Sequence, residues 1–174
     1  MKADALVAQI EQELGQIREA IAQVEMLLEL IRQTENQNIR IGLVSGLALH
    51  LHSFYTGAER IFYDIARDID GEVPTGSDWH RQLLEQMAVE IQQARPPVLT
   101  EQTRLELDEF RRFRHVVRSN YAYKLDPERI LALAQKLPAL FEHLLQDCLR
   151  FCVGLQQQSY PPDLNLNINE PPSR

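Results

Sequence analysis

Apolar side chains recur along most of this chain at the three- and four-residue spacing of amphipathic helices. The first run comprises Leu6, Ile10, Leu14, Ile17, Ile21, Val24, Leu28 and Ile31. The second run follows TENQN at residues 34–38 and comprises Leu43, Leu47, Leu51, Phe54, Ala58, Phe62, Ile65 and Ile69. Each run places one apolar stripe along a helix, with polar residues on the opposite face. The pattern predicts two long helices joined by a short turn, the second ending in a loop at residues 70–78.

Capping residues and prolines predict three further helices. Their expected N-caps are Ser77 or Asp78, then Thr100, then Asp126. The third helix is expected to run through residues 79–94 and to stop at Pro96-Pro97. The fourth includes LELDEFRRFRHVVRS at residues 105–119, and the fifth has Pro127 at its first position. Pro138 lies inside the fifth pattern and is expected to kink it.

Composition agrees with an all-α fold. The chain has 174 residues, of which 44% are hydrophobic and 25% charged, and only seven are glycine. Runs of β-branched and aromatic residues are scarce, which disfavours sandwiches, barrels and doubly wound folds. We expect one domain, residues 1–158, built as a bundle of about five helices. The tail at residues 159–174 is rich in Pro and Asn and is expected to be extended or disordered.

Charge and cysteine usage point to a protein of the cytoplasm. The net charge of −7 excludes general nucleic-acid binding, so any such contact needs a local basic patch. Cys148 and Cys152 lie one helical turn apart and are expected to be buried thiols in a reducing compartment. The start, MKADALVAQIEQELG, lacks the pattern of a signal peptide. The longest apolar stretch, residues 41–49, falls short of the roughly 20 residues that span a membrane.

One segment departs from this routine, FRRFRHVVRSNYAYKLD at residues 110–126. It contains Arg111, Arg112, Arg114 and Arg118 within eight positions that hold no acid. Helical spacing places Arg111, Arg114 and Arg118 on one face. One arginine guanidinium can donate two parallel hydrogen bonds to the oxygens of a phosphate, so this face predicts an anion or RNA contact. The alternative is a solvated helix face paired with glutamates, or one that docks an acidic protein partner.

The order of residues in this segment resembles the signature of HEPN-domain ribonucleases, specifically the HepT-like toxins of HEPN–MNT toxin–antitoxin pairs. Their motif R-x-x-x-x-H-x-Y matches here with Arg114 and Tyr121, while Ser119 stands at the histidine position. The stretches SFYTGAERIFYDIARDIDGEVPTGSDWHRQLLEQM (residues 53–87) and YKLDPERI (residues 123–130) are also similar to that family. The resemblance extends over roughly residues 35–155 and implies a HEPN-type helical bundle.

The resemblance implies a metal-independent endoribonuclease that needs no cofactor and works as a homodimer. Arg114 would hold the scissile phosphate of the RNA, and Arg111, Arg118 and Asn120 would bind RNA beside it. A serine hydroxyl does not titrate near neutrality, so Ser119 cannot transfer protons as the family histidine would. The chain is therefore expected to be inactive or impaired, either as a natural relative or because a histidine was replaced.

The same resemblance implies a partner protein. Tyr121 matches the tyrosine that an MNT-type nucleotidyltransferase antitoxin adenylylates to silence the toxin. The alternative class is a non-catalytic helical binding module that uses the basic helix at residues 111–118. Histidine at position 119 of the native gene would favour the enzyme, and serine there would favour the binding module.

Other candidate residues have simpler interpretations. His115 is about 100° around the helix from Arg114, so we expect it to point elsewhere, in packing or hydrogen bonding. His50 and His52 diverge on one helix and do not suit a metal. The pair Trp79-His80 begins a predicted helix, where it could contact a partner or serve in capping and packing. The first apolar run suits either a coiled coil with another chain or packing within the bundle.

Overall fold

The computed structural model describes residues 2–119 and 125–159, with only the backbone for Lys2, Ser119, Gln158 and Ser159. Its elements are α1 (Lys2–Gln33), α2 (Gln37–Ile65), the π-helical turn η1 (Ala66–Asp70), α3 (Trp79–Met87), α4 (Glu101–Ser119) and α5 (Pro127–Ser159). Within these two stretches there is no β-strand, and an isolated bridge joins Ile91 to Arg95. The all-α prediction with five helices is confirmed. Of the C-terminal tail predicted to be extended or disordered, Ser159 is the last residue of α5, and residues 160–174 fall outside the described residues.

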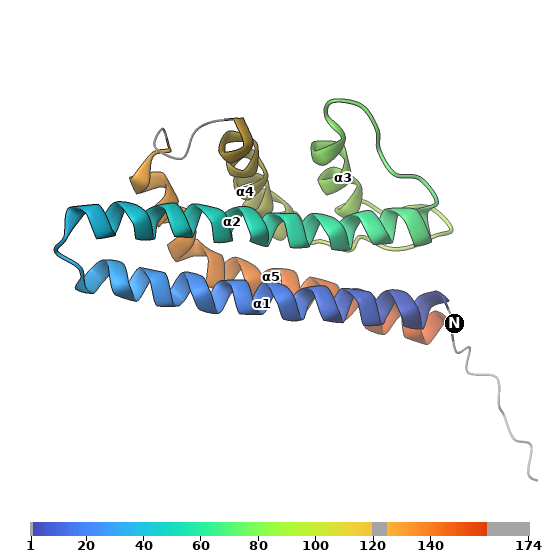
Figure 1. The fold of residues 1–174 in the computed structure, drawn as a ribbon. Coiled ribbons are helices and arrows are strands. Elements are labelled where there is room, and N and C mark those ends of the chain that lie inside the picture. The colour runs from blue at the N-terminus through green and yellow to red at the C-terminus, as the bar shows by residue number, and fades with distance from the viewer. Residues whose placement is uncertain (1, 120–124, 160–174) are drawn as a thin grey trace, which may run out of the picture.

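Three long helices form the body of the molecule (Figure 1). α1 and α2 run antiparallel as a hairpin, and α5 packs against both of them. α3 and α4 lie on the side of α2 away from α1, and each contacts both α2 and the other. α2 is therefore the helix that all the others share, with its two sides facing different partners.

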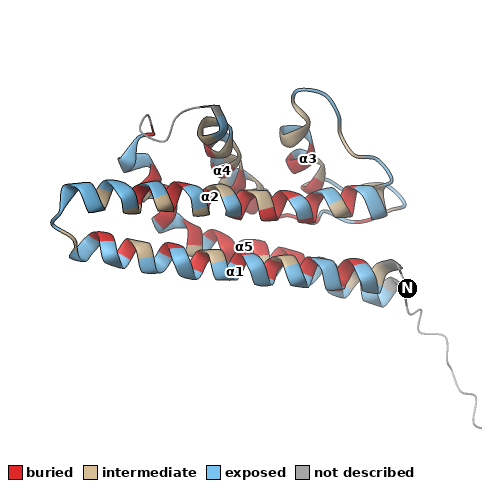
Figure 2. Ribbon diagram, in the orientation of Figure 1, coloured by how far each residue is buried: buried red, intermediate tan, exposed pale blue. Residues whose placement is uncertain are grey.

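The apolar stripes predicted from the sequence line one continuous core (Figure 2). Every residue of the first stripe is buried against this core, so α1 packs within the chain. Cys148 and Cys152 are buried as free thiols in α5, as predicted. Gly57 of α2 lets α1 approach closely, because a Cβ built there would lie 2.8 Å from Ile17 Cγ1. No helix in the described part of the chain is long and apolar enough to cross a bilayer.

Most of the predicted helix ends are confirmed. The Thr100 Oγ1 atom accepts a hydrogen bond of 3.3 Å from the Thr103 N–H at the start of α4. Asp126 Oδ1 accepts one of 3.0 Å from the Glu128 N–H at the start of α5, where Pro127 is the first residue. Side chains that accept the free N–H groups of a first turn fix where a helix begins. Pro138 lies inside α5, which runs on past it.

The third helix is shorter than predicted. α3 ends at Met87, seven residues before the predicted end at Ala94. The Met87 carbonyl accepts hydrogen bonds from the N–H groups of Val98, at 2.9 Å, and Leu99, at 3.1 Å. The intervening chain reverses direction at residues 91–95, with Gln93 at a φ of 64°. Contacts with residues far along the chain therefore end α3 before any proline does.

A buried ion pair fixes this reversal against the end of α2. The guanidinium of Arg95 donates to both oxygens of Asp70, with Nε–Oδ1 and Nη2–Oδ2 distances of 2.6 and 2.7 Å. The two side chains are only 1% and 2% exposed. Arg95 also donates to the carbonyl oxygens of Gln86, Val89 and Pro96. One arginine thus satisfies the carbonyls of an irregular segment and holds α3 on η1.

Candidate functional site

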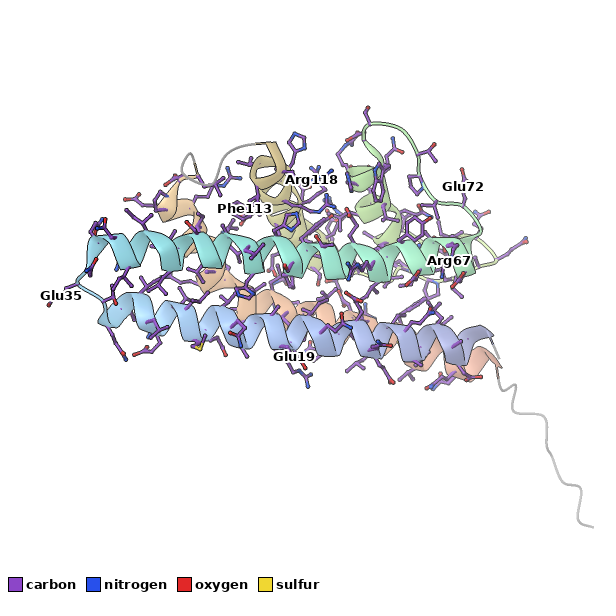
Figure 3. The ribbon with its side chains drawn as sticks, in the orientation of Figure 1. Glu19, Glu35, Arg67, Glu72, Phe113 and Arg118 are labelled. Atoms are coloured by element: carbon purple, nitrogen blue, oxygen red, sulfur yellow. The ribbon has the colours of Figure 1, made fainter. Side chains whose placement is uncertain are left out.

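A cavity of about 560 Å³ lies between the start of α3 and the second half of α4. Its lining residues are Ser77, Asp78, His80, Arg111, Arg114, His115 and Arg118. Arg118 extends from α4 in the direction of α3 (Figure 3). The lining contains three arginines and one acidic residue, although the whole chain carries a net charge of −7. The cavity is therefore a local basic site on an acidic protein.

Arg114 is the most constrained of these arginines. Its Nη2 lies 3.1 Å from Glu59 Oε2, and its Nε donates to Thr56 Oγ1 at 3.4 Å. The Arg114 side chain is 13% exposed and that of Glu59 is 7% exposed. A carboxylate so far from water needs a charged partner, and Arg114 supplies one. α2 thereby fixes the guanidinium of α4 at the cavity wall.

The other oxygen of the same carboxylate binds a histidine from α3. His80 Nδ1 lies 2.5 Å from Glu59 Oε1. The Trp79 ring packs on the imidazole, with 3.7 Å between the ring centroids and an interplanar angle of 31°. Glu59 therefore joins an arginine from α4 and a histidine from α3 through one buried group. The predicted packing role of Trp79-His80 is seen, together with a contact that the sequence did not suggest.

Packing around these side chains explains why they meet. Phe110 lies one turn before Arg114 and contacts Phe54 of α2 edge-on, with ring centroids 5.3 Å apart. Phe110 and Phe113 are both buried, which leaves the adjoining side of α4, with its arginines, along the cavity. At the other wall, the Asp78 carbonyl accepts from the N–H groups of Arg81 and Gln82, each at 3.1 Å. This first turn of α3 places His80 over α2.

Several of the charges around the cavity are balanced locally. Arg111 donates to Asp108 at 2.7 Å, and Arg112 also binds this carboxylate. The Asp78 carboxylate is paired with Arg81, and this hydrogen bond lowers the pKa of Asp78. The predicted alternative, arginines paired with acids on a helix face, therefore describes Arg111 and Arg112, whereas Arg114 pairs across helices with a buried acid.

The positive charge of the cavity also affects a half-buried histidine of α2. The pKa of His52, on α2, is lowered first by its partial burial and then by repulsion from Arg114 and Arg118. A protonated imidazole there would face two guanidinium groups, so its neutral form is favoured. Among the described residues, no group of three or more His, Cys, Asp or Glu side chains is placed to hold a metal ion.

The predicted site residues fall into two sets. Arg111, Arg114 and Arg118 line the same cavity, which brings together the three arginines of the predicted face. Ser119 is the last residue of α4, and its side chain is not described. Asn120 and Tyr121 lie outside the described residues, so their predicted roles in RNA binding and adenylylation stay predictions.

The expectation for His115 was wrong in one respect. We expected it to point away from Arg114, yet both residues line the cavity. A separation of about 100° around a helix leaves two side chains on the same half of its surface. The cavity is wide enough to cover both positions. His115 is exposed on this wall.

Sequence reasoning missed Glu59, Thr56 and His80 as site residues. The signal for Glu59 is its place on an apolar face, because Tyr55, Glu59 and Phe62 follow at helical spacing and all three are buried. A charge on such a face needs a partner, which the sequence does not name. His80 carries no comparable signal, since its partner lies 21 residues away in another helix.

A helical bundle whose fourth helix ends in an arginine-lined cavity has the architecture of a HEPN-type domain. The family model of the HepT-like proteins matches residues 46–155, which is well over half of the chain. The chain therefore belongs to the HepT-like protein family, as the resemblance in the sequence implied. No curated protein and no solved structure matches it.

Proposed function

We propose that this protein is the toxin of a HEPN–MNT toxin–antitoxin pair, a metal-independent endoribonuclease that cleaves cellular RNA in the cytoplasm. The observation that carries the proposal is the cavity itself. It gathers three arginines and two histidines, with Arg114 held in place by a buried carboxylate. Preorganised guanidinium groups suit the charge that develops on a phosphate during cleavage. Membership of the HepT-like family supports the same assignment.

In the proposed reaction, the ribose 2′-hydroxyl attacks the neighbouring phosphorus, and the bond to the 5′ oxygen breaks. Arg114 binds the phosphate oxygens, while Arg111 and Arg118 bind the RNA backbone on either side along α4. Asn120 is proposed as a further RNA contact. Because Ser119 cannot transfer protons, cleavage is impaired relative to a chain with histidine at this position.

The proposed assembly is a homodimer that brings two copies of the Arg114–Tyr121 segment to one cleft. One copy alone offers a sparse site, because residues 114 and 119 are separated by about 7.5 Å of helical rise. The proposed partner is a nucleotidyltransferase antitoxin of the MNT type, which silences the toxin by adenylylating Tyr121. RNA is the substrate, and no membrane takes part.

The variant Ser119→His tests the nuclease proposal. It should raise the rate of RNA cleavage by 10²–10⁴-fold, the usual contribution of a general acid or base. Cleavage of an end-labelled single-stranded RNA should be unaffected by EDTA, and a DNA oligonucleotide of the same sequence should stay intact. The double variant Ser119→His/Arg114→Ala should lose the gain, because the phosphate would no longer be bound.

A clear negative result is possible. If Ser119→His folds as a dimer, cuts no cellular RNA and leaves growth unchanged on expression, the nuclease proposal is wrong. The basic helix at residues 111–118 would then be assigned to a non-catalytic module that docks an acidic protein. Circular dichroism and light scattering on the same samples show that the variant is folded and which assembly it forms.

A further inference from the structure

Two groups of different chemistry are fixed by one buried carboxylate at the cavity wall. Glu59 Oε1 lies 2.5 Å from His80 Nδ1, and Glu59 Oε2 lies 3.1 Å from Arg114 Nη2. Both partners line the cavity, whereas Glu59 is buried behind them. An imidazole thus stands beside the guanidinium that would bind phosphate, and the two cannot move independently while Glu59 holds both.

The contact with Glu59 also determines which nitrogen of His80 is available. When Nδ1 carries the hydrogen that is donated to the carboxylate, the lone pair of the neutral ring is on Nε2. The Trp79 ring covers one face of the imidazole and fixes its plane. A base whose second nitrogen is oriented by a carboxylate is the usual arrangement of a proton-transfer histidine. An imidazole ordinarily exchanges a proton between pH 5 and 8, which a serine hydroxyl does not.

We propose that His80 is the proton-transfer residue of this chain and that Glu59 is its positioning residue; the inference rests on the proposed ribonuclease function. With a phosphodiester on Arg114, His80 Nε2 accepts the proton of the adjacent 2′-hydroxyl. The 2′ oxygen forms a bond to phosphorus, and the bond from phosphorus to the 5′ oxygen breaks. The proton returns through solvent to the leaving oxygen. The products are a 2′,3′-cyclic phosphate and a 5′-hydroxyl.

This role gives the chain with Ser119 a residual activity of its own. His80 lies on α3, whereas position 119 ends α4, so the two positions belong to different helices. The charged groups that face His80 are Glu59 and Arg114 across the carboxylate and, around the cavity, Arg111, Arg118, His115 and the Asp78–Arg81 pair.

The variant His80→Asn tests the role of the imidazole. Its amide nitrogen is near the place of Nδ1 and can donate to Glu59, but no atom of the side chain titrates near neutrality. Cleavage by the chain with Ser119, followed by the yield of 2′,3′-cyclic phosphate, should fall by 10²-fold or more. The pH dependence of the rate should change in what activity is left.

His143→Asn is the matched control. His143 Nδ1 lies 2.9 Å from Glu106 Oε2 in another histidine–glutamate pair, which joins α5 to α4 outside the cavity. Removing this imidazole should leave cleavage within twofold of the starting value. Thermal unfolding of both variants shows whether either change has disturbed the fold.

The Ser119→His background separates a chemical role from a structural one. There a second imidazole is present, so His80→Asn should cost less than tenfold. An equal loss on both backgrounds would assign His80 to the fold alone and would overturn the proposal. Loss of activity in His115→Asn but not in His80→Asn would overturn it as well.

The failure of this inference differs from failure of the nuclease itself. If the Ser119 chain cuts RNA, needs Arg114 and is indifferent to His80→Asn, only the assignment of His80 is wrong. The same holds if the Ser119 chain is silent and Ser119→His is active. If the Ser119 chain and Ser119→His are both folded and neither cleaves RNA, the proposed ribonuclease function is wrong, and so is the assignment of His80.

Discussion

The substitution Asp70→Asn should destabilise this protein far more than its small chemical change suggests. It leaves the Arg95 guanidinium, whose side chain is 1% exposed, without its counter-charge. Removing one partner of a buried ion pair typically costs about 3–5 kcal/mol, because the remaining charge stays out of water. The carboxylate also accepts from Gln86 Nε2 at 2.7 Å, and an amide nitrogen at that position cannot. The whole free energy of unfolding of a domain is only about 5–15 kcal/mol.

Urea denaturation followed by circular dichroism at 222 nm measures this loss. With a slope of about 2 kcal/mol/M, the midpoint should fall by about 2 M. Asp68→Asn is the control, because Asp68 binds Arg67 at 2.7 Å with side chains 33% and 46% exposed. An exposed pair of this kind is worth about 0–1 kcal/mol. If Asp70→Asn costs no more than Asp68→Asn, the buried pair does not hold the end of α3 in place.

Two further predictions concern α2. Gly57→Ala should lower the free energy of unfolding by about 1 kcal/mol, because the new Cβ meets Ile17 at 2.8 Å. Gly15→Ala is the control, because it has open space around it and should raise the free energy of unfolding by about 0.5–1 kcal/mol. Stabilisation by both changes would contradict the close approach of α1 to Gly57. The pKa of His52 is lower in the folded protein than its unfolded value of about 6.5, so the unfolded chain binds a proton more readily. The free energy of unfolding is therefore undiminished above pH 6.5 and falls as the pH drops below it. His52→Gln should therefore flatten the decline of unfolding free energy between pH 7.5 and 5.5, and an unchanged slope would contradict this.

Local signals in the sequence were sufficient for most of the fold. The stripes of α1 and α2 have a strict helical period, and Thr100 and Asp126 accept the N–H groups that their positions predict. The end of α3 could not be found in this way. Residues 88–94 contain no proline or glycine, and what stops the helix is a pair of hydrogen bonds from Val98 and Leu99 to Met87. Tertiary contacts here override local propensity.

The residues of the candidate site likewise divide into those that local spacing predicts and those that only the packing of the helices brings together. Arg111, Arg114 and Arg118 come from one helix, so their spacing was enough to place them together. Glu59 reaches Arg114 from another helix across 55 residues of chain, and His80 joins them only through Glu59, 21 residues further on. No periodicity within one segment encodes such a meeting. A buried acid on an apolar face can be noticed in a sequence, but its partners become visible only once the helices are packed.

The close contact between α1 and α2 makes the site depend on residues that the family match leaves out. Ile17 packs on Gly57, and the neighbouring Thr56 accepts a hydrogen bond from Arg114. The match begins at residue 46, so α1 precedes it entirely. Two chains that shared residues 46–155 but differed in the bulk of this α1 contact would pack differently at Gly57, next to the threonine that binds Arg114. Transplanting the matched segment alone would carry over the side chains of the cavity without the helix that packs on Gly57, beside the threonine that binds Arg114.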